Sequence, residues 1–144
     1  MRAWETAFPQ LTVYQLNQNY RNTNQIVHYV SSTLDVDMQS IGFDGPEISN
    51  VTPRTLSAFF KDKKGLKALI CTEEMKTQLM RKSYNDLTQK GKISRTKINV
   101  MTVYESKGLE FTSVAVAPQG MTDSERYIAF TRALNELAII QIKK

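Results

Sequence analysis

Three short segments combine side chains that are suited to binding an anion or a nucleotide. The first, QNYRNTNQIV (18–27), places Tyr20 and Arg21 directly before a helix-start signal. A planar, always-charged guanidinium suits phosphate oxygens, and a tyrosine ring can stack on a base. If a strand precedes this helix, both residues stand in the crevice at the carboxyl ends of the strands of an open α/β sheet. Taken alone, such a pair is more often an edge tyrosine and a surface arginine.

The second segment, TVYESKGLEF (102–111), runs from a strand end through Ser106 and Lys107 to Gly108 and Glu110. A glycine at this place permits close approach of the backbone, and a carboxylate after it can accept hydrogen bonds from a ribose. The alternative is a polar turn between two buried strands.

The third segment is SERYIAFTRALNEL (124–137). Tyr127, Phe130 and Leu134 are spaced three and four residues apart, so they are expected to form the buried stripe of one helix. At about 100° per residue, Arg132 projects away from that stripe. Its guanidinium is therefore free to face a ligand or water.

The elements around these segments are short apolar strands that alternate with amphipathic helices. This alternation predicts an α/β fold with a mostly parallel sheet and helices on both of its faces. Strands are expected at 12–16, 66–72, 98–103, 112–118 and 137–142, and helices at 23–34, from Pro53, at 73–90 and at 123–134.

Two connections carry separate expectations. Residues 35–52 are polar and rich in turn formers, so they are expected to hold little regular structure, and 35–65 is the variable part of the chain. The run KDKKGLK (61–67) is expected to end the helix before it, with positive charge at the carboxyl end and Gly65 as a left-handed cap. Phosphate contact by this run is the less favoured alternative.

Composition indicates one globular domain over residues 1–144, with 41% hydrophobic residues. The 19 basic and 14 acidic side chains give a net charge of +5, which weakly favours an anionic partner. A single cysteine, Cys71, excludes an internal disulfide framework and is expected to be a buried thiol. No apolar run approaches the roughly 20 residues that span a bilayer, and the expected location is the cytoplasm.

The three segments also resemble a known family when they are taken in order. LNQNYRNTNQIV, INVMTVYESKGLEF and SERYIAFTRALNEL resemble the fourth, fifth and sixth conserved motifs of UvrD/Rep-type superfamily 1 helicases, in their second RecA-like motor lobe. The matches extend from residue 16 to 137. Within that family, the chain is most similar to the HelD-like branch, which acts with RNA polymerase.

The resemblance implies a role for each matched residue at a nucleotide site. Tyr20 would stack on the adenine, Arg21 and Arg132 would reach the γ-phosphate as arginine fingers, and Glu110 would hold the ribose beside Gly108. The implied cofactor is ATP with Mg²⁺.

The resemblance also implies a contact with single-stranded nucleic acid, with DNA favoured over RNA. Thr102, Tyr104 and Lys107 would lie along the strand. Many members of the family carry histidine where this sequence has Tyr104, but a tyrosine ring can also stack on a base.

The sequence contains no G-x-x-x-x-G-K-[ST] loop to hold phosphates and no acidic Mg²⁺-binding motif. The metal and the triphosphate are therefore expected on an N-terminal RecA-like lobe of the same parent chain, and this lobe is not expected to hydrolyse ATP alone. The further implied partner is RNA polymerase, and no membrane is expected. The alternative from a different functional class is a non-catalytic α/β module that binds nucleic acid or RNA polymerase. The direction of translocation and the unwinding of strands are left open.

Overall fold

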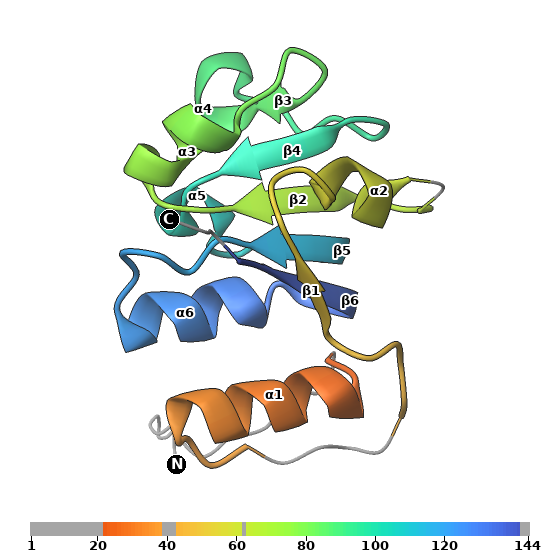
Figure 1. The fold of residues 1–144 in the computed structure, drawn as a ribbon, viewed down its shortest axis with the longest axis vertical. Coiled ribbons are helices and arrows are strands. Elements are labelled where there is room, and N and C mark those ends of the chain that lie inside the picture. The colour runs from red at the N-terminus through yellow and green to blue at the C-terminus, as the bar shows by residue number, and fades with distance from the viewer. Residues whose placement is uncertain (1–21, 39–42, 62, 142–144) are drawn as a thin grey trace, which may run out of the picture.

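In the part of the chain that the structure describes, six parallel strands form one sheet in the order β1-β6-β5-β2-β4-β3 (Figure 1). The computed structural model describes residues 22–38, 43–61 and 63–141. Within them the strands are β1 (Ser49–Val51), β2 (Lys67–Ile70), β3 (Asn85–Asp86), β4 (Ile98–Met101), β5 (Phe111–Val116) and β6 (Ala133–Ile140). Every pair of neighbouring strands is parallel, which confirms the predicted α/β fold with a parallel sheet.

Helices cover both faces of the sheet. They are α1 (Asn24–Leu34), α2 (Leu56–Phe60), α3 (Glu73–Leu79), α4 (Leu87–Lys90), α5 (Val103–Ser106) and α6 (Asp123–Phe130). Side chains of α1, α5 and α6 share one buried cluster with Ala68 and Ile70 of β2. Side chains of α2 and α3 share the other cluster with Leu69. Successive residues of β2 thus face opposite layers, as the pleat of a strand requires.

The first described helix agrees with the sequence. Thr23 caps α1 through its hydroxyl, which accepts a hydrogen bond from the Ile26 N–H at 3.3 Å. One face of the helix is buried and consists of Ile26, Val27, Val30 and Leu34, at the spacing of an amphipathic helix. The buried thiol of Cys71 is also confirmed. The expected strand at 12–16 lies outside the described residues.

The single helix expected at 73–90 is wrong. Helix α3 ends at Leu79, and the chain then forms the short edge strand β3 and the separate helix α4. Tyr84 is buried in the α2–α3 cluster, and Asn85 Nδ2 donates to Asn99 Oδ1 at 2.8 Å. These tertiary contacts, with the pairing of β3 to β4, outweigh the local helical pattern.

The last helix is shorter than expected, and the last strand is longer. Helix α6 ends at Phe130, where the Thr131 hydroxyl donates to the Tyr127 carbonyl at 2.8 Å. Arg132 therefore lies between α6 and β6 and not inside a helix. Strand β6 begins at Ala133 because its residues pair with β5 on one side and β1 on the other.

Smaller differences occur near the other helices. The strand expected at 98–103 ends at Met101, because Thr102 caps the unpredicted helix α5. Strand β1 lies inside 35–52, where little regular structure was expected. Helix α2 ends at Phe60, so Gly65, although its φ is +86°, is not the cap of that helix.

The parallel sheet has two distinct edges. The carboxyl edge holds the strand ends that precede α3, α5 and α6, and it lies on the left of Figure 1. The amino edge holds the residues that lead into the strands. Among the described residues, no helix is long and apolar enough to cross a membrane.

Candidate functional site

Three helices begin at the carboxyl edge, and a threonine caps each of them. Thr72 follows β2, Thr102 follows β4, and Thr122 precedes α6. Each hydroxyl accepts a hydrogen bond from the backbone N–H three residues later, at 3.2 to 3.4 Å. These caps satisfy helix-end donors and fix the course of each loop. A pocket of about 290 Å³ lies between Thr72, Thr102 and Glu125.

Tyr104 stands out at this edge because the residue is 80% exposed. It is the most exposed large hydrophobic or aromatic side chain in the part of the chain that the structure describes. The Lys107 ammonium lies 5.8 Å from the centre of the ring. An exposed ring beside a cation suits stacking on a base next to a phosphate.

Thr102 holds the turn that carries Tyr104. Its N–H donates to Glu105 Oε1 at 2.9 Å, and its hydroxyl accepts from the Glu105 N–H, which makes a reciprocal capping box. The hydroxyl is thus engaged inside the protein. A contact between Thr102 and nucleic acid stays a prediction.

A chain of polar contacts supports that box from neighbouring elements. The Thr88 hydroxyl donates to Glu105 Oε2 at 2.6 Å and accepts from Lys76 Nζ at 2.8 Å. Lys76 Nζ also lies 2.7 Å from Asp86 Oδ1. The contacts join α3, α4 and α5, so they hold the start of α5 in place.

These contacts shift the pKa of three groups. Burial alone would raise the pKa of Asp86, but its hydrogen bond and ion pair with Lys76 lower that pKa overall. Burial likewise works against the charged form of Glu105, while bonds from Thr88 and Thr102 lower its pKa below the usual range. For Lys76, burial would lower the pKa, but Asp86 raises it. All three groups are therefore charged near neutral pH.

Arg132 lies at the opposite, amino edge. Its guanidinium donates from Nε to the Ile128 carbonyl at 3.0 Å and from Nη1 to the Leu109 carbonyl at 3.3 Å. A third bond runs from Nη2 to the Thr131 hydroxyl at 3.4 Å. Because a guanidinium has five N–H donors, these contacts leave two for a ligand.

Arg132 is thereby held against the turn that contains Gly108 and Glu110. Leu109, whose carbonyl accepts from Arg132, lies between those two residues in the chain, and Glu110 is half-buried. Gly108 has φ +80°, and a Cβ on it would meet nothing within 4 Å. The glycine is needed for this backbone conformation, and not for the close approach of another group.

Tyr20 and Arg21 lie outside the described residues. The next residue, Asn22, donates through Nδ2 to the carbonyls of Thr131 and Ala133. The start of α1 thus lies at the amino edge, beside the start of β6. The expected place of Tyr20 and Arg21 at the carboxyl ends of the strands stays a prediction, because those two residues and the strand expected before them lie outside the described part of the chain.

The predicted residues therefore occupy two edges. Gly108, Glu110 and Arg132 come together at the amino edge, while Thr102 and Tyr104 lie at the carboxyl edge. The connection 102–110 between β4 and β5 reaches both edges. No group of three or more His, Cys, Asp or Glu side chains among the described residues could hold a metal ion.

The sequence motifs did not point to the supporting residues Thr72, Lys76, Asp86 and Thr88. One local signal was present for Thr72, which follows the apolar run LKALIC and precedes two glutamates, as at a helix start. No local sequence pattern indicates the ion pair between Lys76 and Asp86. The two residues come together because the chain changes direction after α3.

Comparisons with known proteins agree on the fold. No protein-family model matches the sequence, and no curated protein matches it either. The structure is similar to the C-terminal domain of a possible DNA helicase from Lactobacillus plantarum WCFS1, with 21% identity, 85% of this chain and 87% of that chain covered, and a TM-score of 0.63. It is also similar to the PRRSV helicase, with 12% identity and a TM-score of 0.50, over 88% of this chain and 23% of the viral chain. The chain therefore has a RecA-like α/β fold, like that of the C-terminal domain of the possible DNA helicase.

Proposed function

We propose that this chain is the second RecA-like motor lobe of an ATP-driven helicase or translocase of the UvrD/Rep-type superfamily 1, in its HelD-like branch. The fold and the order of the three motifs support this proposal. The observation that carries it is the contact between Arg132 and the Leu109 carbonyl. It brings the sixth motif against the fifth at one edge of the sheet.

The described residues could contact a bound nucleotide, but they do not form a complete nucleotide-binding site. Arg132 keeps two N–H donors for an anion, and Glu110 lies in the adjoining turn. The sequence has no phosphate-binding loop of its own. A first lobe in the same parent chain would therefore hold the triphosphate and Mg²⁺, where the metal offsets phosphate charge.

In this mechanism the lobe contributes charge and orientation. Arg132, together with Arg21, would donate hydrogen bonds to the γ-phosphate oxygens as negative charge develops on them. Glu110 would accept from the ribose hydroxyls, and Tyr20 would stack on the adenine. Closing the lobe on the triphosphate would bring these groups into reach, and hydrolysis would release them.

The connection 102–110 provides a physical link from nucleotide to nucleic acid. It carries Glu110 at the amino edge and Tyr104 at the carboxyl edge. A movement of the lobe at the nucleotide would therefore also move the ring that contacts a single strand. DNA is the favoured nucleic acid, and RNA polymerase is a protein partner suggested by the HelD-like resemblance.

Hydrolysis of ATP by the parent protein tests the proposal. Replacing Arg132 with alanine should lower the turnover number by roughly 10³-fold or more, the magnitude associated with arginine fingers. Arg132→Lys should restore little, because an ammonium lacks the planar fork of donors. Arg54→Ala removes the same charge from an exposed turn and should leave turnover unchanged.

The same experiment addresses the non-catalytic alternative. A binding module would bind nucleic acid without any hydrolysis that depends on Arg132. Normal hydrolysis and normal stimulation by nucleic acid in Arg132→Ala would exclude the assigned role of this residue. Thermal unfolding of each variant shows whether a loss of turnover merely reflects a loss of folded protein.

A further inference from the structure

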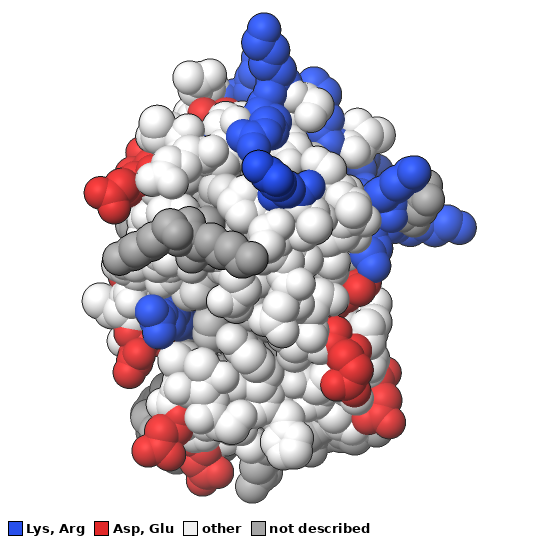
Figure 2. All heavy atoms as spheres, in the orientation of Figure 1, with Lys and Arg blue, Asp and Glu red and all other residues white. Residues whose placement is uncertain are grey.

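Positive charge is concentrated in one part of the chain. Residues 54–97 contain 12 lysines and arginines but four acidic residues, a net charge of +8. The rest of the chain therefore carries −3 of the total of +5. Figure 2 shows the basic atoms gathered over β3, β4 and α2, and most of the acidic atoms at the end formed by α1. The charge is thus far more polarised than the net value indicates.

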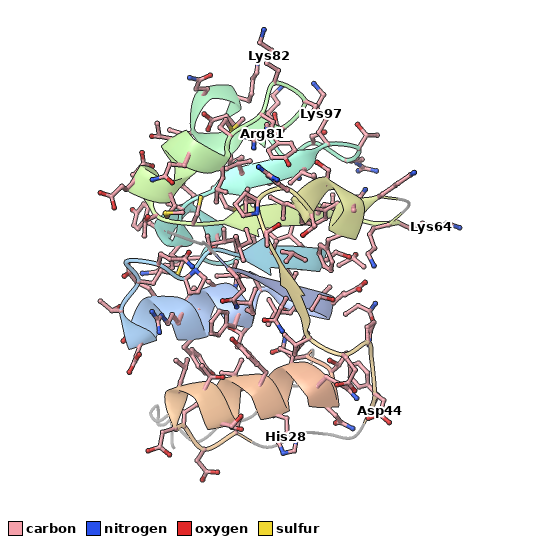
Figure 3. All side chains as sticks on the ribbon, in the orientation of Figure 1. His28, Asp44, Lys64, Arg81, Lys82 and Lys97 are labelled. Carbon is pink, nitrogen blue, oxygen red and sulfur yellow. The ribbon has the colours of Figure 1, made fainter. Side chains whose placement is uncertain are left out.

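Several of these basic residues line an open groove of about 430 Å³ at the amino edge. Its walls are α2, the residues before β3 and the residues before β4. Three lysines and three serine or threonine residues are among the residues that line it: Lys61, Lys67, Lys97, Ser57, Ser83 and Thr96. We call this surface the basic groove. Arg81 and Lys82 adjoin it on the chain, and in Figure 3 they project from the same end of the molecule as Lys97.

Buried asparagines hold one wall of the basic groove in place. Asn99, which is fully buried, accepts from the Ser94 N–H at 2.7 Å and donates to the Lys67 carbonyl at 2.9 Å. The Ser94 hydroxyl in turn accepts from the Lys97 N–H at 2.9 Å. The backbones that carry Lys67 and Lys97 are thereby fixed beside each other, so the two charges are presented from a rigid frame.

None of the lysines of the basic groove forms an ion pair with another described residue. The described ion pairs of residues 54–97 are Lys63 with Glu136 and Lys76 with Asp86. Neither pair lines the groove. Like charges brought together without counter-charges cost free energy in the isolated protein, and an anionic partner would remove that cost.

No fully exposed large hydrophobic side chain of the described residues lies on this surface, although exposed Ala58 and half-buried Ile98 contribute to its lining. The exposed large hydrophobic side chains among the described residues are Val36, Phe43 and Tyr104, and none lies in the basic groove. Phe60 and Tyr84 contribute to the groove, but both are buried. Protein partners usually engage aromatic or aliphatic anchors, whereas a phosphate backbone needs cations and hydroxyl donors.

We propose that the basic groove binds the phosphate backbone of nucleic acid, as a second contact apart from Tyr104. This inference deepens the proposed function and rests on it for the choice of ligand. The groove opens at the amino edge, between elements of the α2–α3 face, whereas Tyr104 lies at the carboxyl edge in α5, which packs on the other face. A nucleic acid held in the groove therefore contacts a surface that stacking on Tyr104 does not use.

Binding of labelled oligothymidine to the chain, measured by fluorescence anisotropy over a series of salt concentrations, tests the proposal. The variant Lys61→Gln/Lys97→Gln should weaken binding about tenfold at low salt and reduce the slope of log affinity against log salt by roughly two. The matched control Lys90→Gln/Lys92→Gln removes the same charge from exposed residues outside the groove. It should weaken binding by less than about twofold.

Each outcome of this comparison has a definite meaning. Equal weakening of binding by both double variants would show that affinity follows net charge alone, and it would contradict the proposal that the groove binds nucleic acid. The absence of any binding to oligothymidine would contradict the proposal as well. Stronger binding of labelled polyglutamate than of oligothymidine would identify an acidic protein as the partner and also overturn the proposal.

Tyr104→Ala separates the groove from the proposed carboxyl-edge contact. If the groove variant binds oligothymidine more weakly while Tyr104→Ala binds it normally, the groove is the binding surface and the proposed stacking contact is excluded. If only Tyr104→Ala binds more weakly, stacking on Tyr104 is supported and binding in the groove is excluded. Identical thermal unfolding curves for all variants ensure that only binding differs.

Discussion

Arg132 Nη1 donates to the carbonyl of Leu109 at 3.3 Å, across 23 residues of chain. This bond fastens the end of α6 to the turn before β5. Leu109 is flanked by Gly108 and Glu110, so the guanidinium is held against the turn that carries the Glu110 residue at the amino edge. The position of Arg132 therefore depends on the shape of the Gly108 turn.

Gly108→Ala should disturb that turn and, in the parent protein, lower ATP hydrolysis. At φ +80° an alanine is strained by about 1 kcal/mol, although its Cβ would meet no neighbour. Gly91 is the matched control, since it has φ +68° and equally open surroundings. Both substitutions should lower the free energy of unfolding by similar amounts, as urea titration can measure. Only Gly108→Ala should reduce turnover, and an equal reduction by Gly91→Ala would contradict the role of the turn.

The isolated chain should fold and show no ATP hydrolysis above background. It offers guanidinium and carboxylate groups to a nucleotide, but it lacks the phosphate-binding loop that dominates nucleotide affinity. Release of phosphate by the purified chain can be compared with that of the Arg132→Ala variant. Hydrolysis that disappears in the variant would show a complete site on this lobe and contradict the two-lobe proposal.

Tyr104→Ala should weaken binding of single-stranded nucleic acid by roughly 1–3 kcal/mol if the ring stacks on a base. Because Tyr104 is 80% exposed, the change should leave stability almost unaffected. Tyr104→Phe keeps the ring and should retain most of the affinity in an anisotropy titration. Equal affinities of the alanine variant and the unaltered chain would show that the exposed ring has another role.

Stability should decrease as the pH falls through the acid range. The folded-state pKa of Asp86 and that of Glu105 lie below their ordinary values, so each carboxylate stabilises the fold above an unfolded pKa of about 4. That contribution is lost as the pH falls through the lower, folded pKa. The raised pKa of Lys76 acts only at high pH, where stability is lost as the pH rises through it.

Asp86→Asn isolates the part of this acid dependence that comes from the ion pair. Asparagine can still cap α4, but it leaves the largely buried Lys76 ammonium without its acidic partner. The variant should lose about 1–3 kcal/mol of stability at neutral pH and show a shallower decrease in acid. Urea midpoints at neutral and acid pH measure both effects. An unchanged pH dependence would show that the Lys76–Asp86 pair contributes nothing to it.

Local sequence patterns were sufficient for several features. Thr23 followed by apolar residues at helical spacing correctly predicted α1, because a cap and an amphipathic stripe act within one helix. Thr122 and Glu125 likewise have the local spacing of a capping box, and the structure contains that box at the start of α6. The alternation of apolar runs and helical segments predicted the parallel α/β sheet.

Other features depended on residues far apart in the chain. The breaks after Leu79 and Phe130 follow from pairing of β3 with β4 and of β6 with β1 and β5, and local helical spacing carries no information about that pairing. The basic groove also needed the fold, because Asn99 joins the chain near Lys67 to the chain near Lys97. The run KDKKGLK alone was better explained as a helix end.

The sequence by itself determined the parallel α/β class, the capped helices and the types of side chain available for phosphate and base contacts, since these depend on local periodicity and chemistry. Only the tertiary structure decided that Arg132 meets the Gly108 turn at one edge while Tyr104 stands at the other. The physical reason is that strand order and strand direction set which loops become neighbours. Both arise from burial and pairing over the whole sheet, which no single segment encodes.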